Sequence, residues 1–383
     1  MDKTVVVMLV TVGWAHAQER DVVPRASPIA AATIHNAVGQ GHVVGAQLLI
    51  GRGGAVEFER SFGRRDRETG EKVDSATLFC IGSCSKAFAS ACVLSLAGEG
   101  RLKLDDEIDT WLKAYGELSV RVPGKPKAKA VRAPTVLELA CHRSGVFSQR
   151  EKPPAAAMAS IRRFTSSLEQ SVATIATVPL SSQPGTRFAY SGAGYCVLGR
   201  VAEVAAKAPF ESLLQTRLGK PLGFSRTTYF PKPDEDNVAV PYVKSDGEEI
   251  PNKRAPHRLG KRLRFPLIGG SLYSTARETA RFVVMIAAKG QFKGEAVLKE
   301  SLWQQFVKPQ SKKDSYSLGF RQTFAKGEKM ATALSHNGSL YGYRSMIHID
   351  LSTGRYIICN LSTRVGGGSS AAVQMIFRDC RAK

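Results

Sequence analysis

Hydrophobic and polar positions alternate near both ends of the chain, whereas apolar segments with helical spacing fill the middle. Turn residues at 52–54 and 352–354 separate the alternating segments, so each end predicts a hairpin. A helix that ends near 33–37 precedes the first hairpin, and another helix follows the second. The predicted strands and the closing helix are 44–51, 55–62, 343–351, 355–361 and 369–381.

The section between the two hairpins is rich in helical patterns. We expect an α+β fold in which an antiparallel sheet built from both chain ends, flanked by helices, carries an inserted mainly helical lobe. The sheet lobe takes about 30–80 and 309–383 and the helical lobe about 81–308, with the functional site where they meet. The candidate helices are 83–97, 106–114, 135–142, 159–176, 192–207, 208–218, 275–289 and 300–307, and the expected surface excursions are 125–132 and 231–263.

The N-terminus has the pattern of an export signal, because Lys3 precedes an apolar run that ends in small residues. The run is too short for a permanent membrane span. Asp2 offsets the charge of Lys3, which leaves an uncleaved anchor as an alternative. We expect a signal peptide at 1–17 cut after Ala17, a single mature domain at 18–383 without a transmembrane segment, and a secreted or periplasmic location.

The chain is strongly basic. It has 54 Lys and Arg against 33 Asp and Glu, a formal net charge of +21, and its 43% hydrophobic content is enough for a globular core. A solvated surface is the favoured interpretation of the basic clusters, and attraction to an anionic cell-envelope polymer or membrane surface is the alternative. Nucleic acid is not an expected partner, because no recognition module is found. The clusters are Lys125, Lys127, Lys129 and Arg132, and Lys253, Arg254, Arg258, Lys261, Arg262 and Arg264.

The seven cysteines show no C-x-x-C metal spacing, and most lie in apolar surroundings. We expect mostly buried thiols with at most one disulfide, and neither a metal nor an organic cofactor. Cys84 adjoins Ser83 and can be mistaken for a nucleophile in labelling experiments.

The central chemical motif is Ser83-Cys84-Ser85-Lys86, which opens a nearly all-apolar helical segment. A serine at i and a lysine at i+3 share one helix face, so Lys86 can approach the Ser83 hydroxyl and accept its proton. Free backbone N–H groups at the start of a helix favour a negative oxygen there. Taken alone, S-x-x-K is also typical of a capping serine followed by a solvated lysine. The apolar surroundings favour the catalytic interpretation.

Two later segments offer partners for this pair. Tyr190 lies between a turn and a helical pattern, where its hydroxyl can relay a proton, although by itself the segment favours a buried tyrosine with one hydrogen bond. His336 is a candidate titratable donor, and the glycine in His336-Asn337-Gly338-Ser339 permits close backbone approach. The Ser339 amide is a candidate second oxyanion donor, although a lone His-Asn-Gly is otherwise an ordinary turn.

Together these segments resemble the serine β-lactamase and penicillin-binding-protein superfamily, particularly its class C-like branch of esterases, D-stereospecific peptidases and transacylases. The resemblance covers roughly residues 30–365. The ordered matches are Ile81–Lys86, Leu104–Asp106, His142–Val146, Pro184–Gly199, Pro221–Phe224, Gly269–Thr275 and His336–Gly338.

The resemblance implies roles at the matching positions. Ser83 corresponds to the acylated nucleophile, Lys86 to its base partner and Tyr190 to the tyrosine of the family's Tyr-x-Asn motif. His336 corresponds to the histidine that some members use in place of the lysine of Lys-Thr-Gly. The oxyanion and substrate-binding positions are Ser83, Asn337, Gly338 and Ser339.

One position departs from the family pattern. Gly192 stands where the Tyr-x-Asn motif has asparagine, so a hydrogen-bonding side chain is lost. We therefore expect a secreted serine hydrolase acting on a small-molecule or peptide ester or amide, esterase-like and with weak or no β-lactamase activity. A D-amino-acid peptidase or carboxypeptidase acting on peptidoglycan-type peptides is one alternative, and a non-catalytic envelope-binding protein of the same fold is another.

Overall fold

The structure is a computed structural model that describes residues 27–122, 124, 126–245, 248–311, 313–366 and 368–381. The predicted signal peptide and Lys125 lie outside these residues. None of the described helices is both long and apolar enough to cross a membrane.

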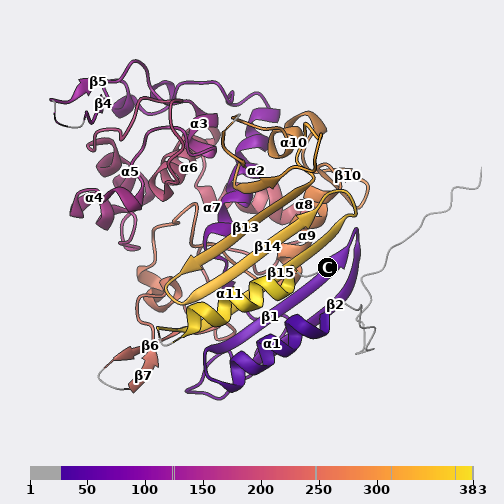
Figure 1. Ribbon diagram of the computed structural model, residues 1–383. Coiled ribbons are helices and arrows are strands. Elements are labelled where there is room, and N and C mark those ends of the chain that lie inside the picture. Colours follow the sequence, from indigo (N-terminus) through magenta and orange to yellow (C-terminus); the bar gives the residue numbers. More distant parts are fainter. Residues whose placement is uncertain are drawn as a thin grey trace, which may run out of the picture.

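A large sheet unites the two ends of the chain (Figure 1). The C-terminal strands run in hairpin order, and the last of them pairs antiparallel with the first N-terminal strand, with Leu48 opposite Cys359. The expected antiparallel sheet built from both chain ends is therefore confirmed. Its main strand order is β11 (Tyr316–Ser317), β12 (Phe320–Thr323), β13 (Ala333–Leu340), β14 (Tyr343–Asp350), β15 (Arg355–Val365), β1 (Val43–Arg52) and β2 (Ala55–Gly63).

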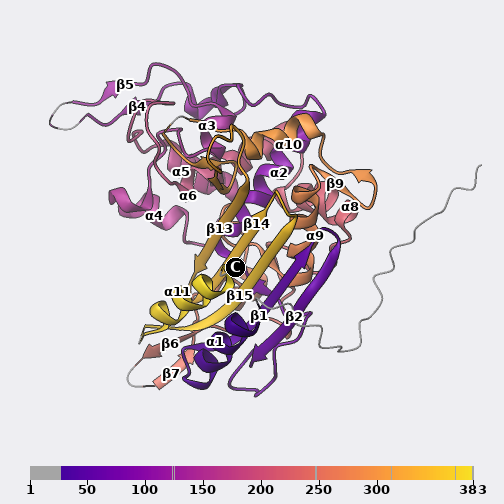
Figure 2. The same ribbon diagram turned by 45° about the vertical axis from the view of Figure 1, so that its right-hand side comes forward.

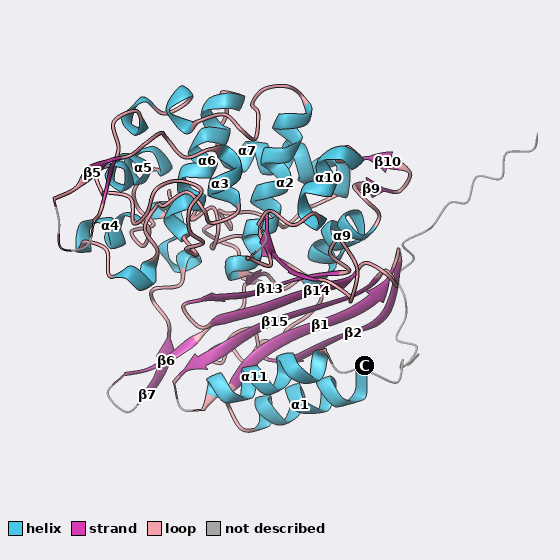
Figure 3. Cartoon of the chain, turned by 45° about the horizontal axis from the view of Figure 1, so that its top comes forward, coloured by secondary structure: helices cyan, strands magenta, loops and turns pink. Residues whose placement is uncertain are grey.

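Both faces of this sheet are covered (Figure 3). Helices α1 (Ser27–Gly39) and α11 (Ser369–Cys380) lie together on one face, and the rest of the helices lie on the other (Figure 2). Along β1, Leu48 and Ile50 face the core under α1 and α11, whereas Leu49 joins the core of the helical side. An apolar strand without polar alternation is what burial on two faces requires.

The helical part inserts between β2 and β11. Its longest helices, α2 (Ser85–Gly98) and α6 (Gly192–Ala206), are apolar almost all round because they pass through the main hydrophobic core. The remaining helices of this part are α3 (Val136–Ala140), α4 (Ala155–Ser160), α5 (Leu168–Ala176), α7 (Phe210–Leu214), α8 (Lys220–Leu222), α9 (Ala276–Ala287) and α10 (Glu300–Val307). Three short ladders complete it: β3 (Phe79–Cys80) with β8 (Tyr273–Ser274), β4 (Ser119–Val120) with β5 (Ala128–Lys129), and β9 (Gln291–Phe292) with β10 (Glu295–Ala296).

Some predicted elements differ from the observed ones. Residues 106–114 form two short 3-10 turns rather than a helix, and 159–176 divides into the end of α4, a turn and α5. Ser167 caps α5 by accepting a hydrogen bond from the backbone of Gln170, so the helix begins there. The helices predicted at 192–207, 275–289 and 300–307 are confirmed with small shifts at their ends.

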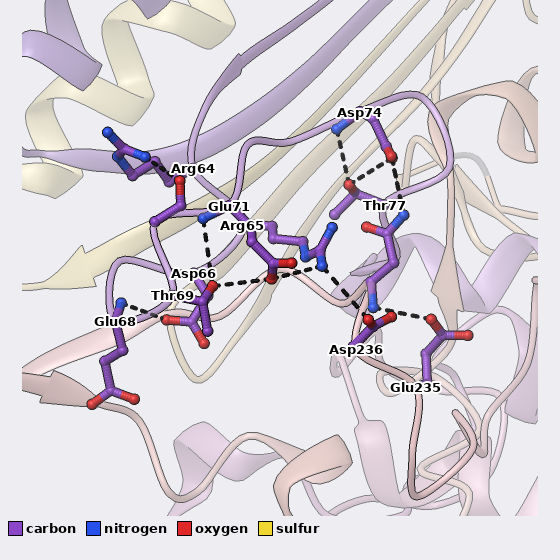
Figure 4. A network of polar contacts seen from close by, with 12 residues as sticks. Arg64, Arg65, Asp66, Glu68, Thr69, Glu71, Asp74, Thr77, Glu235 and Asp236 are labelled. Atoms are coloured by element: carbon purple, nitrogen blue, oxygen red, sulfur yellow. Dashed lines mark hydrogen bonds and ion pairs between the residues drawn. The ribbon is translucent and has the colours of Figure 1, made fainter.

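The segment 231–263 is not simply a surface excursion, and that expectation is wrong for its central part. Strand β6 (Tyr242–Ser245) pairs with β15 and with β7 (Glu248–Pro251), and residues 238–242 are buried. Figure 4 shows how the loop after β2 holds this segment through polar contacts. Arg65 binds Glu71 at 2.6 Å and lies 3.8 Å from Asp236. Non-local pairing of this kind leaves no local pattern in the sequence.

The buried carboxylate of Glu278, in α9, binds the turn that follows α8. Glu278 is 4% exposed, and its oxygens accept hydrogen bonds from the backbone N–H groups of Ser225, Arg226 and Thr227 at 2.6 to 3.3 Å. The hydroxyls of Ser225 and Thr227 donate to it as well, at 3.0 and 2.6 Å. One acidic side chain thus satisfies a whole turn of backbone donors.

We expect Glu278→Gln to lower the free energy of unfolding by about 3 kcal/mol, because the amide NH2 would face backbone donors and the charge-assisted bonds would be lost. Urea unfolding followed by circular dichroism measures the change. Glu300→Gln, at an exposed carboxylate in the first turn of α10, is the control. Equal urea midpoints for the two variants would contradict the assignment.

His257 is a partly buried polar side chain. Its Nδ1 lies 3.2 Å from Tyr273 Oη and 3.1 Å from Tyr343 Oη. Burial of the ring, helped by the charge of Arg258, lowers the pKa of His257 from 6.5 to about 3. Below about pH 6.5, His257 of the unfolded chain therefore takes up a proton, whereas His257 of the folded chain stays neutral down to about pH 3. The contribution to stability is complete above pH 6.5 and is lost as the pH falls towards 3.

We expect His257→Asn, which keeps an acceptor near the Nδ1 position but cannot titrate, to reduce this dependence. Between pH 6.5 and about pH 4 the variant should take up about one proton fewer than the wild type on unfolding. The pH dependence of the urea midpoint reports this proton uptake. His35→Asn, at an exposed position of α1, is the control, and a variant slope equal to that of the wild type would rule the idea out.

Candidate active site

Ser83 lies at the junction between the sheet and the helical part. It is half-buried in a 3-10 turn, Gly82–Cys84, directly before α2. The sequence predicted the helix from residue 83, so the observed start is two residues later. Gly82 has a φ of 53°, a conformation that favours glycine, and this turn presents the serine ahead of the helix.

Lys86 points back from the first turn of α2 towards this serine. It is 2% exposed, and its Nζ lies 3.4 Å from Ser83 Oγ and donates to the Gly269 carbonyl at 2.6 Å. The same nitrogen lies over the rings of Tyr190 and Tyr195, 4.8 and 5.1 Å from their centroids. The predicted Ser83–Lys86 pair is thus formed, and the amine is held from several sides.

Strand β13 approaches the serine turn as closely as backbone permits. A Cβ on Gly82 would stand 2.4 Å from the Ser339 nitrogen, and one on Gly338 would stand 2.1 Å from the Ile81 carbonyl oxygen. Ser345 on β14 donates to that same carbonyl at 2.6 Å. The Ser339 amide therefore lies directly beside the turn that carries the serine.

Residues 336–340 of β13 pair with β14 on one side, whereas the pairing with β12 stops at Ser335. Within the described sheet, this stretch is an edge. Asn337 and Ser339 are exposed, while His336 and Gly338 are buried.

Tyr190 comes to the site from the loop before α6. Its half-buried ring faces Lys86, and its Oη lies 3.5 Å from His336 Nε2. Among the described residues, His336 is the one with which this hydroxyl forms a hydrogen bond. The tyrosine therefore joins the site, but its oxygen is directed towards the histidine.

His336 is 5% exposed on β13. Its Nδ1 lies 2.8 Å from the Asn337 carbonyl oxygen, and its Nε2 lies 3.2 Å from Tyr316 Oη. Burial, together with the charge of Lys86, lowers the pKa of His336 to about 3. His336 was expected to be a titratable donor, but with this lowered pKa its imidazole is neutral under ordinary conditions.

The missing asparagine side chain at position 192 is partly replaced by another residue. A Cβ on Gly192 would stand 2.3 Å from Gln149 Nε2, and the Gly192 N–H donates to Gln149 Oε1 at 3.2 Å. A half-buried carboxamide thus lies at the place that the sequence left empty. Gln149 lies in a 3-10 turn 43 positions before Gly192 and outside the matching segments, so the sequence motifs did not indicate it.

Cys84 is not an alternative nucleophile. Its thiol is buried, with Sγ 3.3 Å from the His336 carbonyl oxygen, and burial raises the pKa of Cys84 to about 12. All seven cysteines are buried free thiols. Within the described residues, no three His, Cys, Asp or Glu side chains gather in a way that could hold a metal ion.

Two buried residues behind His336 also escaped the sequence analysis. His142 Nε2 lies 3.3 Å from Tyr316 Oη, and His142 Nδ1 accepts from the Ser191 N–H at 3.0 Å. His142 stood inside a matching segment, but nothing local indicated its partners. Tyr316 lies 174 positions further along the chain and meets His142 only in the folded protein.

Known proteins resemble the chain in sequence and in fold. Esterase EstB of Burkholderia gladioli is 25% identical over 380 residues, which span 91% of this chain and 93% of the esterase. Among solved structures, EstCE1, a hydrolase with promiscuous acyltransferase activity, superposes with a TM-score of 0.75 at 21% identity and covers 93% of this chain and 98% of its own. The D-amino acid amidase of Ochrobactrum anthropi SV3 gives 0.67 at 20% identity, covering 93% and 98%. The family model described as Beta-lactamase matches residues 30–378, and the chain therefore belongs to the beta-lactamase family of the serine β-lactamase and penicillin-binding-protein superfamily.

Proposed function

We propose that the protein is a serine hydrolase that cleaves esters through an acyl-enzyme on Ser83. The observation that carries the proposal is the buried Lys86 amine, 3.4 Å from the half-buried Ser83 hydroxyl. A hydroxyl is a poor nucleophile unless a neighbouring base removes its proton during attack. Catalytic hydrogen bonds are often long in a substrate-free protein, so 3.4 Å is compatible with this role.

The first half of the reaction acylates the serine. Ser83 Oγ attacks the substrate carbonyl carbon while its proton passes to the Lys86 amine, which acts as the base. The carbonyl oxygen becomes negative and accepts hydrogen bonds from the Ser83 and Ser339 amides. Support for this pairing of donors comes from the close packing of the Ser339 nitrogen against Gly82. The tetrahedral intermediate then expels the alcohol.

The second half releases the acyl group. The alcohol expelled in the first half took its proton from Lys86, with the Tyr190 hydroxyl as relay. The Tyr190 ring lies over the amine, and its Oη is directed towards His336. A water molecule then attacks the ester carbonyl on Ser83, gives its proton to the same base, and frees the acid and the serine. Neutral His336 serves here as a hydrogen-bonding partner of Tyr190 rather than as a cation.

Two observations favour esters over amides. The relative in Burkholderia is named an esterase. Position 192 itself has no side chain to bind a substrate amide, and the Oε1 atom of neighbouring Gln149 is occupied by the Gly192 N–H. Esters have better leaving groups than amides and need less help from such contacts. Hydrolysis of D-amino-acid peptides of the peptidoglycan type is the second candidate.

We also propose that the protein works outside the cytoplasm after removal of residues 1–17, near anionic cell-envelope polymers. The second basic cluster supports this partner. Its six side chains are exposed, and none of them forms an ion pair with a described residue. Long-range attraction then concentrates the protein at a negative surface. These residues are Lys253, Arg254, Arg258, Lys261, Arg262 and Arg264.

We expect Ser83→Ala to reduce p-nitrophenyl ester turnover at least about 1,000-fold, since removing the nucleophile of such a pair abolishes the covalent route. Intact-mass spectrometry should reveal a transient acyl adduct on wild-type protein and none on the variant. Cys84→Ala is the neighbouring control and should retain the adduct, because the thiol is buried.

Brief exposure to benzylpenicillin in the same assay separates the candidates. An adduct from penicillin and none from the ester would redirect the assignment to peptidoglycan-type peptides. If neither compound gives a Ser83-dependent adduct or product, the proposed hydrolase is wrong and a non-catalytic binding protein of this fold remains.

We expect little β-lactamase activity. The kcat/KM for nitrocefin should be at least about tenfold below that for a p-nitrophenyl ester, since a buried partner for the amide contributes roughly 1–3 kcal/mol and is missing at Gly192. Steady-state absorbance assays on the same preparation give both values, with Ser83→Ala as the blank. Nitrocefin turnover comparable to that of the ester, and abolished in the blank, would contradict the assignment.

A further inference from the structure

A continuous chain of hydrogen bonds runs behind the site through two histidines and a tyrosine. It begins at the Ser191 backbone N–H, which lies 3.0 Å from His142 Nδ1, and continues from His142 Nε2 to Tyr316 Oη at 3.3 Å. From there it passes to His336 Nε2 at 3.2 Å and ends with His336 Nδ1, 2.8 Å from the Asn337 carbonyl oxygen. His142, Tyr316 and His336 are all buried.

The two backbone ends give this chain a single direction. An amide N–H can only donate and a carbonyl oxygen can only accept. His142 must therefore accept at Nδ1, carry its proton on Nε2 and donate to Tyr316. His336 must carry its proton on Nδ1, so its bare Nε2 accepts from the Tyr316 hydroxyl. Each bond is satisfied in this arrangement and in no other that keeps both rings neutral.

The surroundings keep all three groups uncharged. Burial, with the charge of Lys86, lowers the pKa of His142 well below its ordinary value, and the same causes lower the pKa of His336 to about 3. Burial raises the pKa of Tyr316 well above its ordinary value. The chain therefore keeps its direction near neutral pH.

We propose that His142 and Tyr316 are positioning residues that hold His336 in the Nδ1–H tautomer and thereby determine what Tyr190 can do in the proposed hydrolysis. The tautomer leaves no proton on His336 Nε2, the atom 3.5 Å from Tyr190 Oη. His336 consequently cannot donate a hydrogen bond that would stabilise a Tyr190 phenolate. Tyr190 keeps its hydroxyl proton as a donor, and Lys86 is the group that takes the proton of Ser83.

The tautomers can be read directly by NMR of protein labelled with ¹⁵N in its imidazole rings, because protonated and bare ring nitrogens resonate far apart. The chain has only seven histidines, and His336→Gln and His142→Asn assign the two signals of interest. His142 has a φ of 59°, which asparagine tolerates. We expect Nδ1–H on His336 and Nε2–H on His142 in the wild type.

Tyr316→Phe removes the central hydroxyl and leaves the ring. We expect the His336 signals to move towards a mixture of tautomers and kcat for the ester to fall about tenfold, the cost of one hydrogen bond. KM should change little, since Tyr316 lies behind His336. Tyr115→Phe is the control for removing a buried tyrosine hydroxyl, because Tyr115 donates one hydrogen bond, to the Val172 carbonyl, in the helical part. The control should lower thermal stability without either change at the site.

Nε2–H on His336 in the wild type would overturn the proposal, and so would a Tyr316→Phe variant with unchanged kcat. His142→Asn breaks the chain at its other end and should reproduce the mixture of tautomers, which guards against a folding defect specific to Tyr316→Phe. The ring signals do not depend on turnover. If the wild type shows no Ser83-dependent hydrolysis, the proposed function fails while the NMR spectrum still decides whether the tautomer is held.

Discussion

The close approach of β13 to the turn before α2 is the constraint on which the site depends. At Gly82 and Gly338 the two backbones are so close that a single additional carbon on either residue would collide with the other segment. This contact joins the sheet, made from both chain ends, to the helix that carries Ser83 and Lys86. Without this contact, the Ser83 hydroxyl and the edge of the sheet at β13 would not form one site.

The site also has few fixed charges. The Lys86 amine has a carbonyl oxygen and two aromatic faces as neighbours, and it forms no ion pair with a described carboxylate. The two histidines behind it are held neutral by burial. In such surroundings the direction of each hydrogen bond matters more than net charge, because each group has few alternative partners. The positions of protons are therefore determined by backbone groups at the ends of the network.

Most of the fold could be predicted from periodicity. The two hairpins and the long apolar helices have strong local patterns, since β1 is mostly apolar and α2 is apolar almost all round. The predicted elements were wrong where the structure depends on residues far apart in the chain. Residues 106–114 have helical composition but form 3-10 turns, and the parallel pairing of β6 with β15 joins residues more than a hundred positions apart.

Local patterns are enough to predict which residue types meet at the site, because the three-residue spacing of Ser83 and Lys86 and the His-Asn-Gly segment are local features. How these residues act depends on tertiary contacts. These contacts bury His336 enough to keep it neutral, place Gln149 beside Gly192, and link His142 to His336 through a tyrosine. Burial and hydrogen-bond direction arise from segments far apart in the chain, and no local pattern records them.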